Sequence, residues 1–182
     1  MKATGIVRRI DDLGRVVIPK EIRKTLRIKE GTPLEIFTDR EGEIILKKYS
    51  PIGELNVFAK EYAEALAQSS GMVACITDHD QVVAAAGQGS REYMGKPISK
   101  ALEDAITERS SVFANGNDRG RIPVTQEQRE PLYSQIMQPI ISAGDTVGSV
   151  LFLGKNERDV MGESEKMLIR TASGFLGRQM EQ

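Results

Sequence analysis

Five cationic side chains near the start of the chain have the types and spacing that suit contact with an anionic polymer: Arg8, Arg9, Arg15, Arg23 and Lys24. Arginine presents a planar fork of N–H donors to phosphates and base edges, and lysine supplies a compact positive charge. Residues 1–29 hold nine Lys or Arg against three Asp or Glu, whereas the 182-residue chain carries a net charge of −1. With so few counter-charges, this segment favours a nucleic-acid surface over a merely solvated face.

The elements that must position these cations are predicted to be short strands around one short helix. Asp11 to Gly14 predicts a turn, because aspartate side chains accept hydrogen bonds from nearby backbone N–H groups and glycine adopts a positive φ. Pro19 ends a strand and suits the first turn of a helix. The expected strands cover residues 5–10, 15–18, 34–38 and 43–48, and the expected helix covers residues 20–26.

This segment is too small to be stable by itself. About fifty residues bury little apolar area, so a second copy is expected to complete the core. Intertwining two copies enlarges that core and covers strand edges that would otherwise be exposed. The sequence therefore predicts an all-β N-terminal domain that forms an intertwined dimer.

The run GIVRRIDDLGRVVIPKEIRKTLRIKEGTPLEIF, followed by EIILKKY, resembles the swapped-hairpin DNA-binding domain of AbrB-type transition-state regulators. The resemblance implies a small barrel shared by two chains that binds double-stranded DNA, with AT-rich shape contributing to recognition. The family's DNA-contacting arginines map by motif onto Arg8, Arg15 and Arg23, with Arg9 and Lys24 as further basic positions. Lys24 stands where some members have arginine, so it keeps the charge and loses the bidentate geometry.

The remainder of the chain has the opposite charge and a different pattern. Residues 1–50 carry twelve basic and eight acidic side chains, and residues 51–182 carry thirteen basic and eighteen acidic ones. A proline and a glycine, Pro51 and Gly53, punctuate the transition. We expect a DNA-binding domain over residues 1–50, a linker over 51–53 and a second domain over 54–182.

The second domain is predicted to be an α+β sandwich, with terminal helices on one face of an antiparallel sheet. The expected helices cover residues 53–69, 98–109 and 163–180, and the expected strands cover 71–77, 82–86, 134–143 and 146–153. The run QPIISAGDTVGSVLFL resembles the paired strands that close a GAF domain. That resemblance implies either a pocket for a small-molecule effector or dimerisation through the terminal helices. The apolar stripe on residues 163–180 fits such a helical interface and equally fits the core of a single chain.

Residues 110–128 are predicted to be a loop, because they are rich in Asn, Gly, Arg and Thr. Arg119, Arg121 and the nearby Arg129 are candidates for binding an anionic effector. The alternative is that these arginines are simply solvated, and the sequence leaves both readings open.

Side chains for other chemistry are scarce. His79 is the single histidine and has no companion at metal-ligand spacing, and the single cysteine, Cys75, lies in an apolar strand. The sequence has no phosphate-binding or dinucleotide-binding fingerprint and no nucleophile-and-base pair. We therefore expect no enzyme activity, metal or cofactor. With no apolar run of about 20 residues, a cytoplasmic protein that does not enter the membrane is expected.

The predicted function is DNA-binding transcription regulation, with the second domain sensing an effector, holding the oligomer, or both. The two modules in this order resemble sporulation regulators of endospore-forming bacteria, which implies activation and repression of forespore genes by a dimer or homotetramer. One alternative is the antitoxin of a toxin–antitoxin pair, although the patterned residues after 50 are unlike a disordered acidic tail. A third reading is a small-molecule binding protein whose basic segment only dimerises.

Overall fold

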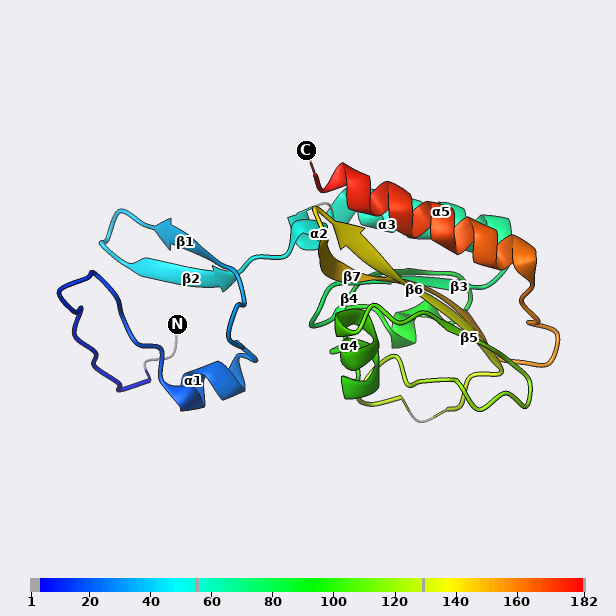
Figure 1. Cartoon of the computed structure of the whole chain (residues 1–182), viewed down its shortest axis with the longest axis horizontal. Helices are drawn as coiled ribbons and strands as arrows, with labels where there is room; N and C mark the ends of the chain where they lie inside the picture. Colours follow the sequence, from blue (N-terminus) through cyan, green and yellow to red (C-terminus); the bar gives the residue numbers. More distant parts are fainter. Residues whose placement is uncertain (1–3, 55, 129, 182) are drawn as a thin grey trace. The chain divides into compact units, whose positions relative to one another are not determined.

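The computed structural model describes residues 4–54, 56–128 and 130–181. The chain divides between Tyr49 and Ser50 into an N-terminal unit and a C-terminal unit. Each unit is described by itself (Figure 1).

The N-terminal unit contains one helix and one antiparallel hairpin: α1 (Lys20–Thr25), β1 (Leu34–Thr38) and β2 (Ile44–Lys48). The hairpin tip is closed by Asp39, whose Oδ1 accepts hydrogen bonds from the N–H groups of Glu41 (3.0 Å) and Glu43 (2.9 Å). Gly42, with φ 83°, completes the reversal that brings Thr38 opposite Ile44. The predicted helix over 20–26 and the predicted strands over 34–38 and 43–48 are confirmed.

The first two predicted strands differ from the structure. Residues 5–10 and 15–18 have no strand ladder in the described chain. Alternating apolar residues make them suited to a sheet, but a ladder needs a neighbouring strand, and β1 and β2 pair with each other. None of the described residues 4–49 is buried. This unit therefore has the sequence pattern of a β domain without enough chain to build its core.

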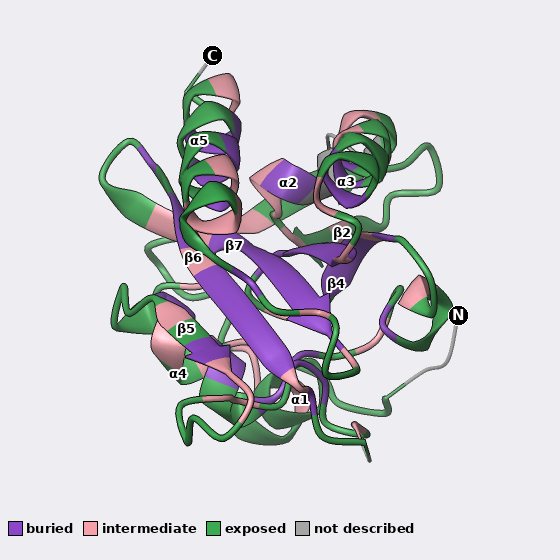
Figure 2. Ribbon diagram, turned by 90° about the vertical axis from the view of Figure 1, so that its right-hand side faces the viewer, coloured by how far each residue is buried: buried purple, intermediate pink, exposed green. Residues whose placement is uncertain are grey.

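The C-terminal unit is an antiparallel five-stranded sheet in the order β4-β3-β7-β6-β5, covered on both faces by helices (Figures 1 and 2). The strands are β3 (Val73–Thr77), β4 (Val82–Ala86), β5 (Val112–Asn115), β6 (Ser134–Ser142) and β7 (Asp145–Gly154). The helices are α2 (Pro51–Glu54), α3 (Asn56–Ser70), the 3-10 turn η1 (Ser90–Glu92), α4 (Lys100–Thr107) and α5 (Glu163–Gln179). Beneath the helices the strands are buried (Figure 2).

Two apolar clusters lie on opposite faces of this sheet. Along β7, Phe152 belongs to the cluster under α3 and α5, and its neighbour Leu151 belongs to the cluster under α4. This alternation is the two-residue period of a strand. The predicted α+β arrangement, with the terminal helices on one face of an antiparallel sheet, is confirmed.

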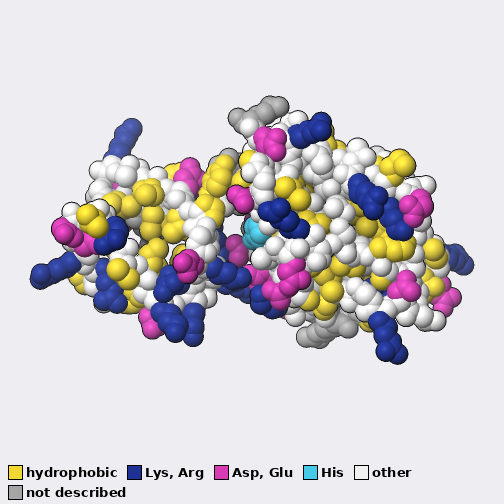
Figure 3. Space-filling view, in the orientation of Figure 1, with side chains coloured by type: hydrophobic (Ala, Val, Ile, Leu, Met, Phe, Trp, Pro, Cys, Tyr) yellow, Lys and Arg dark blue, Asp and Glu magenta, His cyan; other side chains and the backbone are white. Residues whose placement is uncertain are grey.

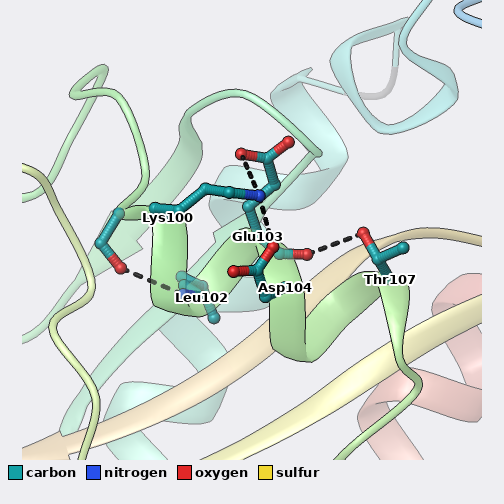
Figure 4. A network of polar contacts seen from close by, with 6 residues as sticks. Lys100, Leu102, Glu103, Asp104 and Thr107 are labelled. Carbon is teal, nitrogen blue, oxygen red and sulfur yellow. Dashed lines mark hydrogen bonds and ion pairs between the residues drawn. The ribbon is translucent and has the colours of Figure 1, made fainter. Parts of the chain in front are cut away.

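Helix α4 is capped and charge-paired within its own length (Figure 4). The Ser99 hydroxyl accepts a hydrogen bond from the Leu102 N–H at 3.0 Å, which satisfies one free donor of the first turn. Lys100 pairs with Asp104, and its Nζ lies 3.8 Å from a Glu103 carboxylate oxygen. The charges on this helix are thus largely matched to each other.

Two further elements differ from the sequence-based expectation. Strand β5 lies inside the predicted loop 110–128. Its residues alternate as a strand requires: Ala114 is buried, whereas Phe113 is 41% exposed. The Nζ of Lys166 lies 3.7 Å from the centroid of the Phe113 ring. Helix α2 occupies the expected linker 51–53, because Ile52 is 1% exposed and joins the core under α3 and α5. The predicted helix 53–69 corresponds to the end of α2 together with α3, and Leu55 lies outside the described residues.

Candidate nucleic-acid interface

A closed turn joins the first three candidate arginines. Asp11 Oδ1 accepts hydrogen bonds from the N–H groups of Leu13 (3.1 Å) and Arg15 (2.7 Å), and the Asp11 N–H donates to the Arg15 carbonyl (3.1 Å). Gly14, with φ 76°, supplies the reversal. Arg8 and Arg9 precede this turn and Arg15 ends it, so the two arms of one turn carry all three arginines.

Helix α1 carries the other two candidates. Pro19, with φ −58°, immediately precedes the helix, and Arg23 and Lys24 lie in its last turn. Cations at a helix C-terminus face the negative end of the helix dipole, which favours this placement by a few tenths of a kcal/mol. Ile22, which directly precedes Arg23 on this helix, is partly buried.

All five candidate cations are exposed: Arg8, Arg9, Arg15, Arg23 and Lys24. Among the described residues, Arg15 is the one of the five with an ion pair; its Nε lies 2.8 Å from Asp11 Oδ2, and its side chain stays 70% exposed. The Arg15 backbone N–H, followed by its guanidinium, holds the pKa of Asp11 below its ordinary value. This pair was not among the sequence-based predictions, although the opposite charges of Asp11 and Arg15, four residues apart, were a signal for it.

Apolar side chains are exposed beside these cations (Figure 3). Examples are Val7 (86% exposed), Val17 (70%) and Ile44 (69%). The wider set is Ile6, Ile10, Leu13, Val16, Leu26, Ile36, Phe37 and Leu46. A monomeric protein rarely leaves so many large apolar residues in water, so this surface marks an interaction site.

The C-terminal unit has a shallow cleft of about 550 Å³ on the sheet face opposite α3 and α5, lined by Glu92, Tyr93, Lys96, Thr125, Glu127, Gln128 and Glu130. Several of its polar groups already have partners within the chain. Lys155 Nζ lies 2.5 Å from a Glu92 carboxylate oxygen, and Gln128 accepts from the Val124 N–H (2.8 Å) and donates to the Glu130 carbonyl (3.0 Å). This surface is mainly acidic, unlike the anion site that the sequence suggested.

Neither Arg119 nor Arg121 is among the described residues that line that cleft. Arg121 Nη1 donates to the carbonyls of Gly116 and Tyr133, so it holds the loop 116–121 against the start of β6. Arg119 is exposed in the same loop, and Arg129 lies outside the described residues.

The single cysteine and the single histidine, Cys75 and His79, both make contacts within the fold. Cys75 is fully buried on β3, and burial raises the pKa of its thiol, so the reactive thiolate is disfavoured. His79 Nε2 lies 2.7 Å from the Thr146 carbonyl oxygen. Over residues 4–54, 56–128 and 130–181, no group of three or more His, Cys, Asp or Glu is arranged to hold a metal ion. In the same ranges, no helix has the length and apolar character needed to span a membrane.

Comparison with known families divides the chain as the fold does. A family model described as "Stage V sporulation protein T C-terminal, transcription factor" matches residues 54–181. A second model, described as "Antidote-toxin recognition MazE, bacterial antitoxin", matches residues 7–54.

Individual relatives cover both the whole chain and its parts. Stage V sporulation protein T of Bacillus subtilis (strain 168) is 53% identical over 182 residues, which is 100% of each chain. The transition state regulatory protein AbrB of the same organism is 65% identical over 51 residues, covering 28% of this chain and 52% of that protein. The GAF domain from Acinetobacter phosphoenolpyruvate-protein phosphotransferase has a TM-score of 0.55 at 13% identity, covering 74% of this chain and 84% of that one. These findings confirm an AbrB-like N-terminal domain and a GAF-like fold for the C-terminal unit.

Proposed function

We propose that this chain, which belongs to the stage V sporulation protein T family of transcription factors, binds double-stranded DNA through its N-terminal unit and regulates sporulation genes. The observation that carries the proposal is the exposure of five cations on a unit that is 65% identical to AbrB over 51 residues. The full-length likeness to stage V sporulation protein T supports forespore genes as targets, with both activation and repression. Because its target is genomic DNA, the chain would be located in the cytoplasm.

Recognition would rest on side chains extended from a turn and a short helix. All five candidate cations would contact phosphates by charge, and the four arginines would also contact base edges through paired N–H donors. The five are Arg8, Arg9, Arg15, Arg23 and Lys24. A surface without a long recognition helix reads few bases directly, so the narrow minor groove and the stiffness of AT-rich DNA would contribute to selection. Affinity should fall steeply with salt, because each neutralised phosphate releases counterions.

The DNA-binding form would contain at least two chains. None of the described residues 4–49 is buried in the single chain, so a second copy is needed to give this unit a core. The segments 5–10 and 15–18 would then find ladder partners in the other chain. This is the intertwined, swapped-hairpin dimer, and a second interface through the C-terminal units would give a tetramer.

A second interface is supported by the outer surface of α3 and α5. Phe58 and Tyr62 on α3 have ring centroids 5.7 Å apart, and Phe175 on α5 lies 5.5 Å from the Tyr62 ring. Phe175 is 41% exposed and Met167, also on α5, is 72% exposed. An aromatic cluster that remains partly in water suits pairing with another copy of the same helices.

The C-terminal unit would also be the place of effector sensing. Its GAF-like fold fits that role, and the cleft near Tyr93 is one site where a small molecule would bind. No enzymatic step is proposed for it, because Cys75 is buried and the full-length relative is named for sporulation rather than catalysis.

DNA binding is tested by fluorescence anisotropy with AT-rich and GC-rich duplexes of equal length. We expect the full chain to prefer the AT-rich duplex, and Arg8→Ala, Arg15→Ala and Arg23→Ala each to weaken binding strongly while far-UV circular dichroism stays unchanged. Undiminished binding by all three variants would refute the assignment of this surface.

The dimer is tested at two neighbouring positions, Val16 and Val17, which are 53% and 70% exposed in the single chain. On an extended strand they face opposite sides, so one of them must point into a shared core. We expect one of the two variants, Val16→Asp or Val17→Asp, to lower the mass of the assembly measured by light scattering. The other variant should keep the wild-type mass. If both variants keep the wild-type mass, the intertwined dimer is wrong.

An antitoxin is the second candidate function, because the MazE model matches residues 7–54. In that case a small toxin would bind the chain and co-purify with it from its native host. The two apolar clusters of the C-terminal unit argue against this function, since they make a folded domain where an antitoxin has its disordered tail. Purification without any small partner protein supports the transcription regulator.

A further inference from the structure

Two buried hydroxyl side chains line the cleft of the C-terminal unit. They belong to Tyr93 and Thr125, and each residue is 3% exposed. Within the described ranges neither hydroxyl makes a hydrogen bond, whereas every fully buried side-chain nitrogen or oxygen atom there has a partner. Both hydroxyls therefore keep contact with solvent, and the cleft is the opening that both residues line. A polar group so deeply placed and without a protein partner suits a ligand atom.

Both walls of the cleft are held by the backbone. On one wall, the Lys96 N–H donates to the Tyr93 carbonyl at 3.0 Å. On the other wall, the Ser99 N–H donates to the carbonyl of Val124, directly before Thr125, at 2.9 Å. The cleft volume of about 550 Å³ falls within the range of small-molecule sites, about 300–1,000 Å³. The site is thus formed before any ligand arrives.

The charged groups of the lining leave an excess of negative charge. Glu92 is paired with Lys155, whose Nζ lies 2.5 Å from one of its carboxylate oxygens. Glu127 and Glu130 are exposed, and neither forms an ion pair with another described residue. Lys96 supplies one positive charge to the described lining. Two carboxylates are therefore available to a ligand against one ammonium group.

The Tyr93 phenol reports the same electrostatic environment. Burial raises the pKa of this phenol, and the neighbouring Cys75, Glu92 and Glu130 raise it further. The phenol therefore stays neutral at physiological pH, with a hydroxyl that both donates and accepts. Surroundings that disfavour a phenolate also disfavour an anionic ligand and favour a cation.

We propose that this cleft binds a small organic cation, with its ammonium group against Glu127 and Glu130 and a hydroxyl or carbonyl group against Tyr93 and Thr125. The inference rests on the proposed role of the C-terminal unit in effector sensing, and it names the class of effector. A phosphorylated or carboxylate ligand would be repelled by the two carboxylates, whereas an ammonium group gains charge-assisted hydrogen bonds from them.

The test uses three four-carbon probes that keep one hydroxyl and differ in charge at the other end. These are 4-aminobutan-1-ol, which is a cation, butane-1,4-diol, which is neutral, and 4-hydroxybutanoate, which is an anion. Each probe is titrated against the full chain, and its dissociation constant is measured by saturation-transfer difference NMR. Far-UV circular dichroism checks that every variant keeps the wild-type fold.

We expect the amino alcohol to bind at least about tenfold more tightly than the diol or the hydroxybutanoate, because its hydrogen bonds are charge-assisted. Glu127→Gln and Glu130→Gln should each weaken its binding about tenfold, and Tyr93→Phe, which removes only the hydroxyl, about fivefold. Glu61→Gln is the matched control. It removes the same charge from an exposed position on α3, which packs on the opposite face of the sheet, and should bind the amino alcohol as wild type does.

The outcomes separate this inference from the proposed function. Equal or tighter binding of the diol or the hydroxybutanoate, or no binding of any probe, overturns the assignment of a cationic ligand. Undiminished binding of the amino alcohol by both glutamine variants overturns the site. DNA binding is measured separately by fluorescence anisotropy on an AT-rich duplex without probes, and its absence in the wild-type chain overturns the proposed function.

Discussion

Removing Arg23 should change the salt dependence of DNA binding by an amount that is calculable in advance. Arg23 lies in the last turn of α1 and is exposed, so Arg23→Ala removes no ion pair among the described residues. A dimer loses two such arginines. Any change in affinity is then a change in contact with DNA rather than in folding.

The magnitude follows from counterion release. If a dimer makes about six phosphate contacts, each with a slope of about −0.9 in log K against log salt, raising salt from about 50 to about 200 mM weakens binding about 2,000-fold. With about four contacts left, the same change weakens the variant about 150-fold. The ratio of wild-type affinity to variant affinity should therefore fall about twelvefold between these two salt concentrations.

The assay is fluorescence anisotropy of the full chain on one AT-rich duplex at several salt concentrations. Arg158→Ala is the control, because it removes the same charge from an exposed position in the C-terminal unit. We expect the Arg158→Ala slope to equal the wild-type slope. If Arg23→Ala keeps the wild-type slope, Arg23 neutralises no phosphate; if Arg158→Ala lowers the slope equally, Arg23 contributes only net charge. Either result contradicts a DNA contact by Arg23.

Three further predictions test the structure around these surfaces. A Cβ at Gly177 on α5 would collide with the Ile141 carbonyl oxygen, so Gly177→Ala should lower the free energy of unfolding in urea by about 1–3 kcal/mol, whereas Gly174→Ala, with open space around it, should not lower it. Cys75 should resist thiol reagents at neutral pH until the protein is unfolded, because burial raises the pKa of its thiol; rapid native labelling would contradict that burial. The pKa of the Asp11 carboxyl, followed by carbon NMR, should lie below its ordinary value of 3.8. The ionised carboxylate therefore stabilises the turn fully above pH 3.8, and this stabilisation is lost as the pH falls through the lower pKa of the folded state. Arg15→Ala should raise this pKa, and an unchanged pKa would contradict the ion pair.

Local pattern was enough to predict the elements whose partners are close in sequence. The hairpin of β6 and β7 turns at Ala143 and Gly144, both with positive φ, and its strands alternate between the two apolar clusters. The helix α5 follows an apolar stripe that includes Ile169 and Leu176. For these elements the period of the sequence and the burial in the fold agree.

The differences arise where the environment of a segment depends on distant or absent partners. Residues 5–10 and 15–18 have the composition of strands but find no ladder within one chain. Strand β5 is only four residues long and exists because β6 offers it an edge. Arg121 was a candidate for an effector, and only the fold shows that its guanidinium binds backbone carbonyls.

The candidate DNA surface was predictable in its residues and not in its electrostatic detail. The five cations were evident from their types and spacing, and the structure leaves all of them exposed. That Asp11 pairs with Arg15 depends on how the turn closes, which follows from backbone geometry rather than composition. Of the five candidates, the four without an ion pair among the described residues are Arg8, Arg9, Arg23 and Lys24.

The most direct test of DNA binding by the N-terminal unit is hydrogen exchange, followed by mass spectrometry, of the full chain with and without an AT-rich duplex. Slowed exchange is predicted in peptides covering residues 5–25, with exchange in β3, β6 and β7 unchanged. Slowed exchange confined to the C-terminal unit, or no change anywhere at saturating duplex, would contradict a DNA-binding surface built from these cations.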